Sequence, residues 1–224
     1  MVRKLQRSFL VFVPIILVLS LTNCSSRQAR ESYESAKKLS DEKKYSEAVK
    51  EFETVVKDYP KNEYAAKSMY ELANIYGHQN LPDVKKEDAY QKAADYYLKV
   101  VNGFPDLPEA GKCAMESGKL YQSLLVPNVT KEESLNNAVT LYKKVVEKYS
   151  DSPDAEPALF MIGFIQANEL KQIDSAKTSY QTFLRKYPNS KLANSVKLEL
   201  NNLGVAPEEI LKKQTEQKAS GSSK

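Results

Sequence analysis

The chain has 224 residues, of which 42% are hydrophobic and 28% charged, and its formal net charge is +4. This composition is ordinary for a soluble globular or repeat protein. Arg3, Lys4 and Arg7 lie in the first 23 residues, which contain no acid; the rest of the chain has 30 basic and 29 acidic side chains. The charge of this part of the chain is nearly balanced, and it therefore gives no indication of nucleic-acid binding.

Residues 1–23 have the pattern of a secretory signal peptide, with a basic start and an apolar run from Phe9 to Leu21. That run is 13 residues long, whereas a helix needs about 20 residues to cross a bilayer. It ends in Leu-Thr-Asn-Cys at residues 21–24, which resembles a bacterial lipobox. The resemblance implies that Cys24 is lipidated and becomes the new N-terminus. An uncleaved anchor or cleavage elsewhere is the alternative, because Asn23 replaces the usual small residue.

Ser25 follows the lipobox cysteine, where lipoproteins of the inner membrane in enterobacteria have Asp. The resemblance therefore implies a location in the cell envelope, at the outer membrane and facing the periplasm. Residues 24–30 are expected to form a short tether, because helical periodicity begins only at Glu31. Its extended length would be about 20 Å, so we expect the folded domain to lie close to the membrane.

One pattern occurs four times and predicts repeated helices. Each copy has Ala, an aromatic residue four positions later, an apolar pair, and a second aromatic residue followed by Pro or Ser. The apolar positions fall on one helix face, and Pro ends a helix. Five residues after each Pro or Ser, another Ala opens a second kind of helix. The four copies begin at Ala48, Ala93, Ala138 and Ala176.

The second kind of helix has a small residue at its centre. Two of these residues are Gly118 and Gly163, and a Gly inside a helix costs about 1 kcal/mol relative to Ala. We therefore expect another helix to cross closely at both positions.

This alternation resembles the tetratricopeptide repeat over roughly Glu31 to Gly204. The resemblance implies an all-α solenoid over residues 31–205, with about four helix pairs and a capping helix from Ser190 to Leu203. Successive Pro or Ser positions are 45, 45 and 38 residues apart, compared with about 34 in the family. Residues 206–224 are expected to form a short helix and a disordered tail.

The two 45-residue units carry matching insertions, and we expect both loops on one edge of the solenoid. Such loops often carry binding residues, although a duplication without function is the alternative. The matching residues are Leu81, Pro82 and Val84 in the first loop, and Val126, Pro127 and Val129 in the second. Thr130 and Glu133 are expected to form a capping box at the start of the next helix.

In tetratricopeptide proteins the first helix of each pair lines the concave face, which implies a candidate binding groove. An aromatic residue or Met at each level would anchor an extended peptide or a partner helix. Alternatively, these rings complete the packing of the helix pairs. The positions implied by the resemblance are Tyr33, Lys37, Tyr70, Asn74, Met115, Lys119, Phe160 and Phe164.

Candidate catalytic chemistry is scarce. His78 is the only histidine, and we expect it on the surface of a loop. Cys113 lies among small residues and is expected to be a buried hydrophobic residue. No phosphate-binding loop or Ser/His/Asp arrangement occurs in the sequence. We therefore expect no enzyme activity, no metal and no cofactor.

Together these features predict a non-enzymatic, lipid-anchored scaffold that binds a protein or peptide of the cell envelope. A lipobox followed closely by such repeats resembles the BamD-type lipoproteins of the β-barrel assembly machine. The repeats also resemble the C-terminal domain of the CpoB (YbgF) proteins of the Tol-Pal system, but no coiled coil precedes them here. A protein that captures a secreted peptide or a cell-wall component is a further alternative.

Overall fold

The computed structural model describes residues 25–205 and 208–209, and every regular element among them is a helix. The expected signal peptide, Cys24 and most of the expected tail lie outside these residues. The chain divides into two compact units, Met1–Cys113 and Ala114–Lys224.

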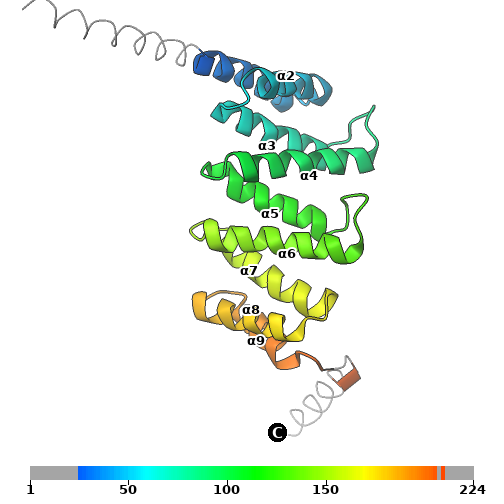
Figure 1. Ribbon diagram of the computed structural model, residues 1–224, viewed down its shortest axis with the longest axis vertical. Helices are drawn as coiled ribbons and strands as arrows, with labels where there is room; N and C mark the ends of the chain where they lie inside the picture. The colour runs from blue at the N-terminus through cyan, green and yellow to red at the C-terminus, as the bar shows by residue number, and fades with distance from the viewer. Residues whose placement is uncertain (1–24, 206–207, 210–224) are drawn as a thin grey trace, which may run out of the picture. The chain divides into compact units, whose positions relative to one another are not determined.

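Unit 1 is a stack of consecutive helices. A helix over residues 25–41 is followed by α2 (Tyr45–Asp58), α3 (Glu63–His78), α4 (Lys86–Gly103) and the first residues of α5 (Pro108–Gln122). Helix α3 packs against α2 on one side and α4 on the other (Figure 1). The apolar stripe predicted from the repeated pattern is buried, and includes Ala48, Phe52, Val55, Ala93, Tyr97 and Val100.

Unit 2 contains the rest of α5 and four further helices. These are α6 (Lys131–Lys148), α7 (Ala155–Phe164) with a π-helical turn η1 (Ile165–Glu169), α8 (Ile173–Lys186) and α9 (Ala193–Asn202). Helix α7 packs against α6 and α8, and α8 packs against α9. The predicted all-α, repeat-type fold, with about four helix pairs and a terminal helix, is confirmed for the part of the chain that the structure describes.

The four copies of the repeated pattern end in the same backbone turn. The aromatic residue after each second helix donates its N–H to the carbonyl four residues earlier, as Tyr59 does to Val55 at 3.0 Å. Its own carbonyl then accepts the N–H three residues later, as from Asn62 at 2.9 Å, and that residue accepts from Ala65 at 3.0 Å. The same bonds recur after Phe104, Tyr149 and Tyr187. The sequence repeat is therefore also a repeat of backbone geometry.

Differences in repeat length arise in two places, the connections between the first and second helix of each pair and the second helices, which have 14 residues in α2 and α8 and 18 in α4 and α6. These connections are short at residues 42–44 and 170–172, and long at residues 79–85 and 123–130. The long connections are the two insertions identified in the sequence. The second one ends in the expected capping box, in which Thr130 and Glu133 bond each other's backbone N–H groups.

The expected close crossing at the two central glycines is confirmed in unit 2. A Cβ atom on Gly118 would lie 2.6 Å from Cε1 of Tyr142, and one on Gly163 would lie 2.5 Å from Cε1 of Tyr180. Both rings are fully buried. Any larger side chain at these glycines would therefore overlap a ring that has no room to move.

The first helix begins earlier than the sequence indicated, and the expected extended tether is corrected. Residues 25–30 are helical and continuous with the helix that was expected to start at Glu31. Ala29 is fully buried, and Asn62 Nδ2 donates to Ser26 Oγ at 3.0 Å. These contacts hold the first turns of the helix against the rest of unit 1.

The last helix is shorter than expected, because α9 spans Ala193–Asn202 and not Ser190–Leu203. Gly204 follows it with a φ of +76°, a conformation that glycine adopts without strain. Val196 is buried as expected, but Leu198 is 56% exposed. The other exposed residues of α9 are Asn194, Ser195, Lys197 and Asn201, and such a polar surface is what the terminal helix of a solenoid needs.

Candidate functional site

The two aromatic groove positions in unit 1 complete the packing of their own helix pairs. Tyr33 lies between Phe52 and Tyr64, with ring-centroid distances of 5.8 and 5.6 Å. Tyr70 packs against Tyr97 at 6.3 Å. Both Tyr33 and Tyr70 remain half-buried. Each ring therefore supports the fold with one side and keeps part of its surface available to a partner.

The corresponding positions in unit 2 differ from one another. Met115 is buried, so its side chain does not offer the exposed anchor that the groove model requires. Phe160 packs against the rings of Tyr180 and Phe183, each at 6.4 Å. Phe164 contacts Phe160 at 6.3 Å and is half-buried. In unit 2 Phe164 is thus the groove ring with fewer internal contacts.

A polar network joins the first helix to α3 in unit 1. Lys37 Nζ lies 3.0 Å from a carboxylate oxygen of Asp41 and 3.6 Å from one of Glu71. The hydrogen bond with Asp41 raises the pKa of Lys37. Burial raises the pKa of Glu71, despite the opposing effect of Lys37. Burial also raises the pKa of Tyr33, and the nearby charge of Glu71 adds to this. The interaction with Lys37 therefore offsets only part of the free-energy cost of burying the charged carboxylate of Glu71.

The remaining polar groove positions make local bonds. The Tyr97 hydroxyl donates to Asn74 Oδ1 at 2.6 Å, which leaves the amide NH₂ of Asn74 as the group that can donate to a ligand. Lys119 is exposed and pairs with Glu116 at 2.7 Å.

Glu71 and Asn74 line a pocket of about 340 Å³ in unit 1. The pocket lies between the end of the first helix, the start of α2 and the second half of α3. Its lining is largely polar and includes Asp41, Tyr45 and His78. A carboxylate, an amide donor and a tyrosine on one concave surface are suited to binding polar groups of a peptide.

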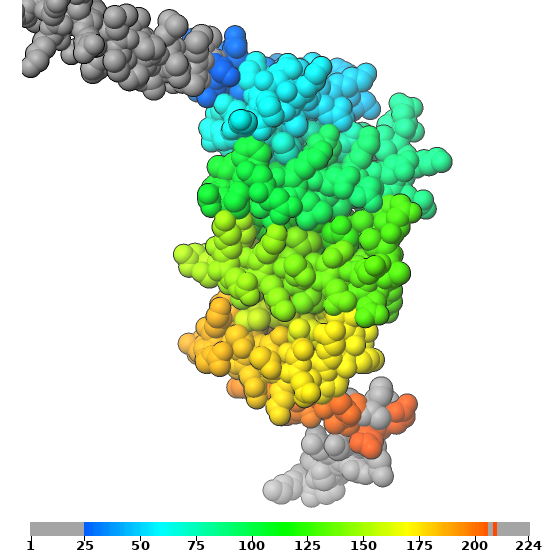
Figure 2. All heavy atoms as spheres, in the orientation of Figure 1, coloured from blue at the N-terminus to red at the C-terminus, as the bar shows by residue number. Residues whose placement is uncertain are grey.

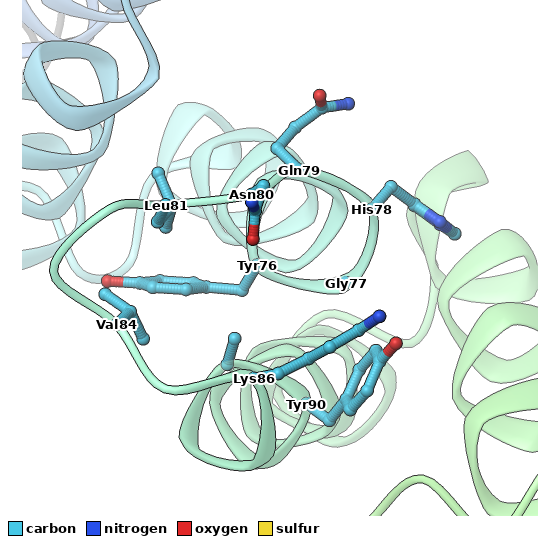
Figure 3. Close-up of a pocket in the computed structure, with 10 residues that line it drawn as sticks. Tyr76, Gly77, His78, Gln79, Asn80, Leu81, Val84, Lys86 and Tyr90 are labelled. Atoms are coloured by element: carbon cyan, nitrogen blue, oxygen red, sulfur yellow. The ribbon is translucent and has the colours of Figure 1, made fainter.

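A second pocket, of about 250 Å³, lies beneath the first long loop (Figure 3). The ring of Tyr76 extends from α3 under the loop, and Lys86 lies beside the ring of Tyr90 at the start of α4. Of the three loop residues predicted to bind a partner, Leu81 is buried, Val84 is half-buried and Pro82 is exposed. Leu81 therefore anchors the loop to the fold and does not face a partner.

The second long loop follows the same arrangement. Val126 is buried, whereas Pro127 and Val129 are half-buried. The two residues just before them, Leu124 and Leu125, were not predicted to bind a partner but are 47% and 36% exposed. These two leucines are the apolar surface that this loop offers.

A tyrosine pair on α3 and α4 was also not expected. The rings of Tyr76 and Tyr96 are stacked, with centroids 6.1 Å apart and an interplanar angle of 8°. Both hydroxyls donate to the same carboxylate oxygen of Glu53, each at 3.3 Å. Lys92 lies over the Tyr76 ring at 4.8 Å, and Lys99 over the Tyr96 ring at 4.9 Å. The cluster brings three helices together, so no local sequence pattern could reveal it.

Two residues with reactive side chains lie as follows. Cys113 is fully buried, as predicted. His78 is exposed, as predicted, but it is the last residue of α3 and does not lie in the loop. Across residues 25–205 and 208–209, no group of three or more His, Cys, Asp or Glu side chains is placed to hold a metal ion. Within the same ranges, no helix has both the length and the apolar character needed to span a membrane.

Comparison with protein families gives a match to a family model described as the tetratricopeptide repeat, over residues 157–190. The chain contains a tetratricopeptide repeat. The matched residues run through α7, η1 and α8, the pair whose short connection keeps it nearest to the family's period of about 34 residues. The helix pairs with long connections depart further from that period. A comparison with curated proteins found no match.

Proposed function

We propose that the protein is a non-catalytic adaptor that binds another protein through the surface of its repeats. The tetratricopeptide repeat over residues 157–190 is the observation that carries this proposal. Repeats of this kind stack into extended surfaces that bind peptides and protein segments. The half-buried rings of Tyr33, Tyr70 and Phe164, and the polar pocket beside Glu71, are the surfaces suited to such a partner.

We also propose that the adaptor works in a bacterial cell envelope, attached to the outer membrane through lipid on Cys24. The basic and apolar leader followed by Cys24 supports this location. In its more specific form, the proposal is that the protein takes part in the assembly of outer-membrane proteins, as BamD-type lipoproteins do. A Tol-Pal role and the capture of a secreted peptide are the other possible outcomes of the test below.

The test is photo-cross-linking in living cells. A photoreactive amino acid replaces Lys119 or Phe164, which lie on first helices of the pairs. In the matched controls, the same amino acid replaces Lys99 or Lys143, which lie on second helices. Complexes are identified by mass spectrometry. We expect the first pair to capture an envelope protein and the second pair to capture much less. Equal capture from both pairs would show that the first helices are not the binding surface.

The identity of the captured protein decides between the specific roles. Components of the β-barrel assembly machine support the first form, Tol-Pal components the second, and a small secreted peptide the third. Anchoring is tested separately by Cys24→Ser, which should move the protein out of the membrane fraction and remove the acyl groups from its intact mass.

A further inference from the structure

We propose that one end of unit 1 rests directly on the membrane, where its basic side chains contact anionic phospholipid headgroups. This inference depends on the proposed lipid on Cys24. Its basis is the junction between that cysteine and the fold, which is much shorter than the sequence alone indicated.

The junction leaves almost no free chain. The first helix already includes residue 25, and consecutive Cα atoms are about 3.8 Å apart. Cys24 therefore lies within about 7.6 Å of Ser26, whatever the conformation of the link. An extended tether over residues 25–30 would instead have allowed a separation of about 20 Å.

The first turns of that helix are fixed to the start of α3. Asn62 accepts the N–H of Tyr64 through Oδ1 at 3.0 Å, and its Nδ2 donates to Ser26 Oγ at 3.0 Å. Ala29 is fully buried one turn later. In Figure 2 the first described residues, in blue, lie directly against the cyan atoms of the same unit. A lipid on Cys24 would thus hold this end of unit 1 at the bilayer.

The side chains at this end favour an anionic surface. The exposed bases are Arg27, Arg30, Lys57 and Lys61, and the acids nearest to them in sequence are Glu31, Asp58 and Glu63. Glu31 pairs with Arg27 at 2.8 Å, and Glu63 pairs with Lys67 at 3.4 Å. Outside these two ion pairs, the named charges are three bases, Arg30, Lys57 and Lys61, and one acid, Asp58. Basic residues near an anionic membrane strengthen the binding of a protein to that membrane.

This placement sets the orientation of unit 1. Helix α3 has 16 residues, which corresponds to a length of about 24 Å. The first long loop and its pocket lie at the other end of α3 from Asn62. They would therefore be held well away from the headgroups and be open to a partner in the aqueous space.

The test compares a matched pair of labelled variants, Asp58→Cys and Asp83→Cys. Both positions are exposed, whereas Cys113 is fully buried and the thiol of Cys24 is blocked by lipid. Each purified lipoprotein is labelled with a fluorophore and placed in vesicles that contain a nitroxide on the lipid headgroup. We expect loss of most of the fluorescence at position 58 and little loss at position 83. Equal quenching at the two positions overturns the inference.

Two further variants test whether the short junction and the basic side chains cause the quenching at position 58. A flexible Gly/Ser insertion of about six residues between Ser25 and Ser26 adds about 20 Å of reach, and should lower the quenching at position 58 to that at position 83. Arg30→Gln with Lys61→Gln should weaken the quenching only when the vesicles contain phosphatidylglycerol. If neither change alters the quenching at position 58, the inferred contact is wrong.

The lipid itself is tested independently. If the intact mass shows no acyl groups, the proposed anchoring fails. In that case a fluorescent amino acid is incorporated at position 58 or 83 in place of the labelled cysteine, the Cys24 thiol is coupled to a maleimide lipid in the same vesicles, and the comparison is repeated. Quenching at position 58 alone then supports the inferred contact between this end of unit 1 and the membrane, although cells do not attach the lipid. Equal quenching at the two positions rejects the inferred contact.

Discussion

Gly163 in α7 lies against the ring of Tyr180 in α8, so that a methyl group on the glycine would stand 2.5 Å from Cε1 of the ring. The ring is fully buried, and Phe160 packs on it at a centroid distance of 6.4 Å. The same relationship joins Gly118 to Tyr142. Both helix pairs are therefore held at a separation that a residue with a side chain does not allow.

The first prediction is that Gly163→Ala destabilises the protein. Ala is better than Gly inside a helix by about 1 kcal/mol, so a change without steric conflict would be stabilising. We expect a loss of about 1–3 kcal/mol from overpacking, measured by urea denaturation. Gly103→Ala is the control, because no atom lies within 4 Å of its added Cβ. A Gly163→Ala variant as stable as that control would contradict the close crossing.

The second prediction concerns two equivalent tyrosines. The Tyr142 hydroxyl donates to Gln122 Oε1 at 2.7 Å, whereas the Tyr180 hydroxyl is buried and has no acceptor among the described residues. Tyr142→Phe should cost about 1 kcal/mol, the usual contribution of one hydrogen bond. Tyr180→Phe should be neutral or stabilising. Thermal unfolding of both variants measures the difference, and equal losses would be inconsistent with the unpaired hydroxyl.

The third prediction is a pH dependence at Glu71. Because burial raises the pKa of this carboxyl in the folded state, its charged form opposes folding above that pKa. Glu71→Gln should therefore raise the melting temperature at neutral pH. The gain should shrink as the pH falls through the folded pKa toward the lower unfolded one. Glu116→Gln, which removes the pair with Lys119 at 2.7 Å, is the control and should give no such gain at neutral pH.

The fourth prediction concerns the exposed leucines of the second loop. Leu124 has a φ of 57°, a conformation that Asn tolerates better than Leu. Leu124→Asn with Leu125→Ser should leave stability unchanged within about 0.5 kcal/mol, and should reduce the recovery of cross-linked partner. Leu198→Ser, at a more exposed position on α9, should leave recovery unchanged. Full recovery with the double variant would exclude the second loop from binding.

Much of the fold could be predicted because its main contacts repeat along the chain. The spacing of Ala and aromatic residues specified the helices, and the glycines at positions 118 and 163 indicated where helices cross. Both signals are local in sequence and recur in successive repeats, at spacings of 45, 45 and 38 residues. The spacing also showed which two units carry added length, but not that part of it extends their second helices to 18 residues.

Features that depend on contacts between distant residues were missed. The first turns of the first helix are held by the burial of Ala29 and by Asn62, which is 36 residues from its partner Ser26. The Tyr76–Tyr96 stack depends on three helices meeting. Met115 was placed in the groove by its position in the repeat, but its burial is decided by how neighbouring helices cover it. Periodicity predicts on which face of a helix a side chain lies, but it does not predict how deeply that side chain is buried.

The shared turn after Tyr59, Phe104, Tyr149 and Tyr187 has a consequence for engineering. Since the turns between pairs keep one backbone geometry, added length is accommodated only at the opposite ends of the helices. Residues 170–172 are therefore an acceptor site for foreign loops, such as a graft of residues 79–85. A peptide or reporter inserted there should be displayed without repacking the helices, which would make this chain a modular display scaffold.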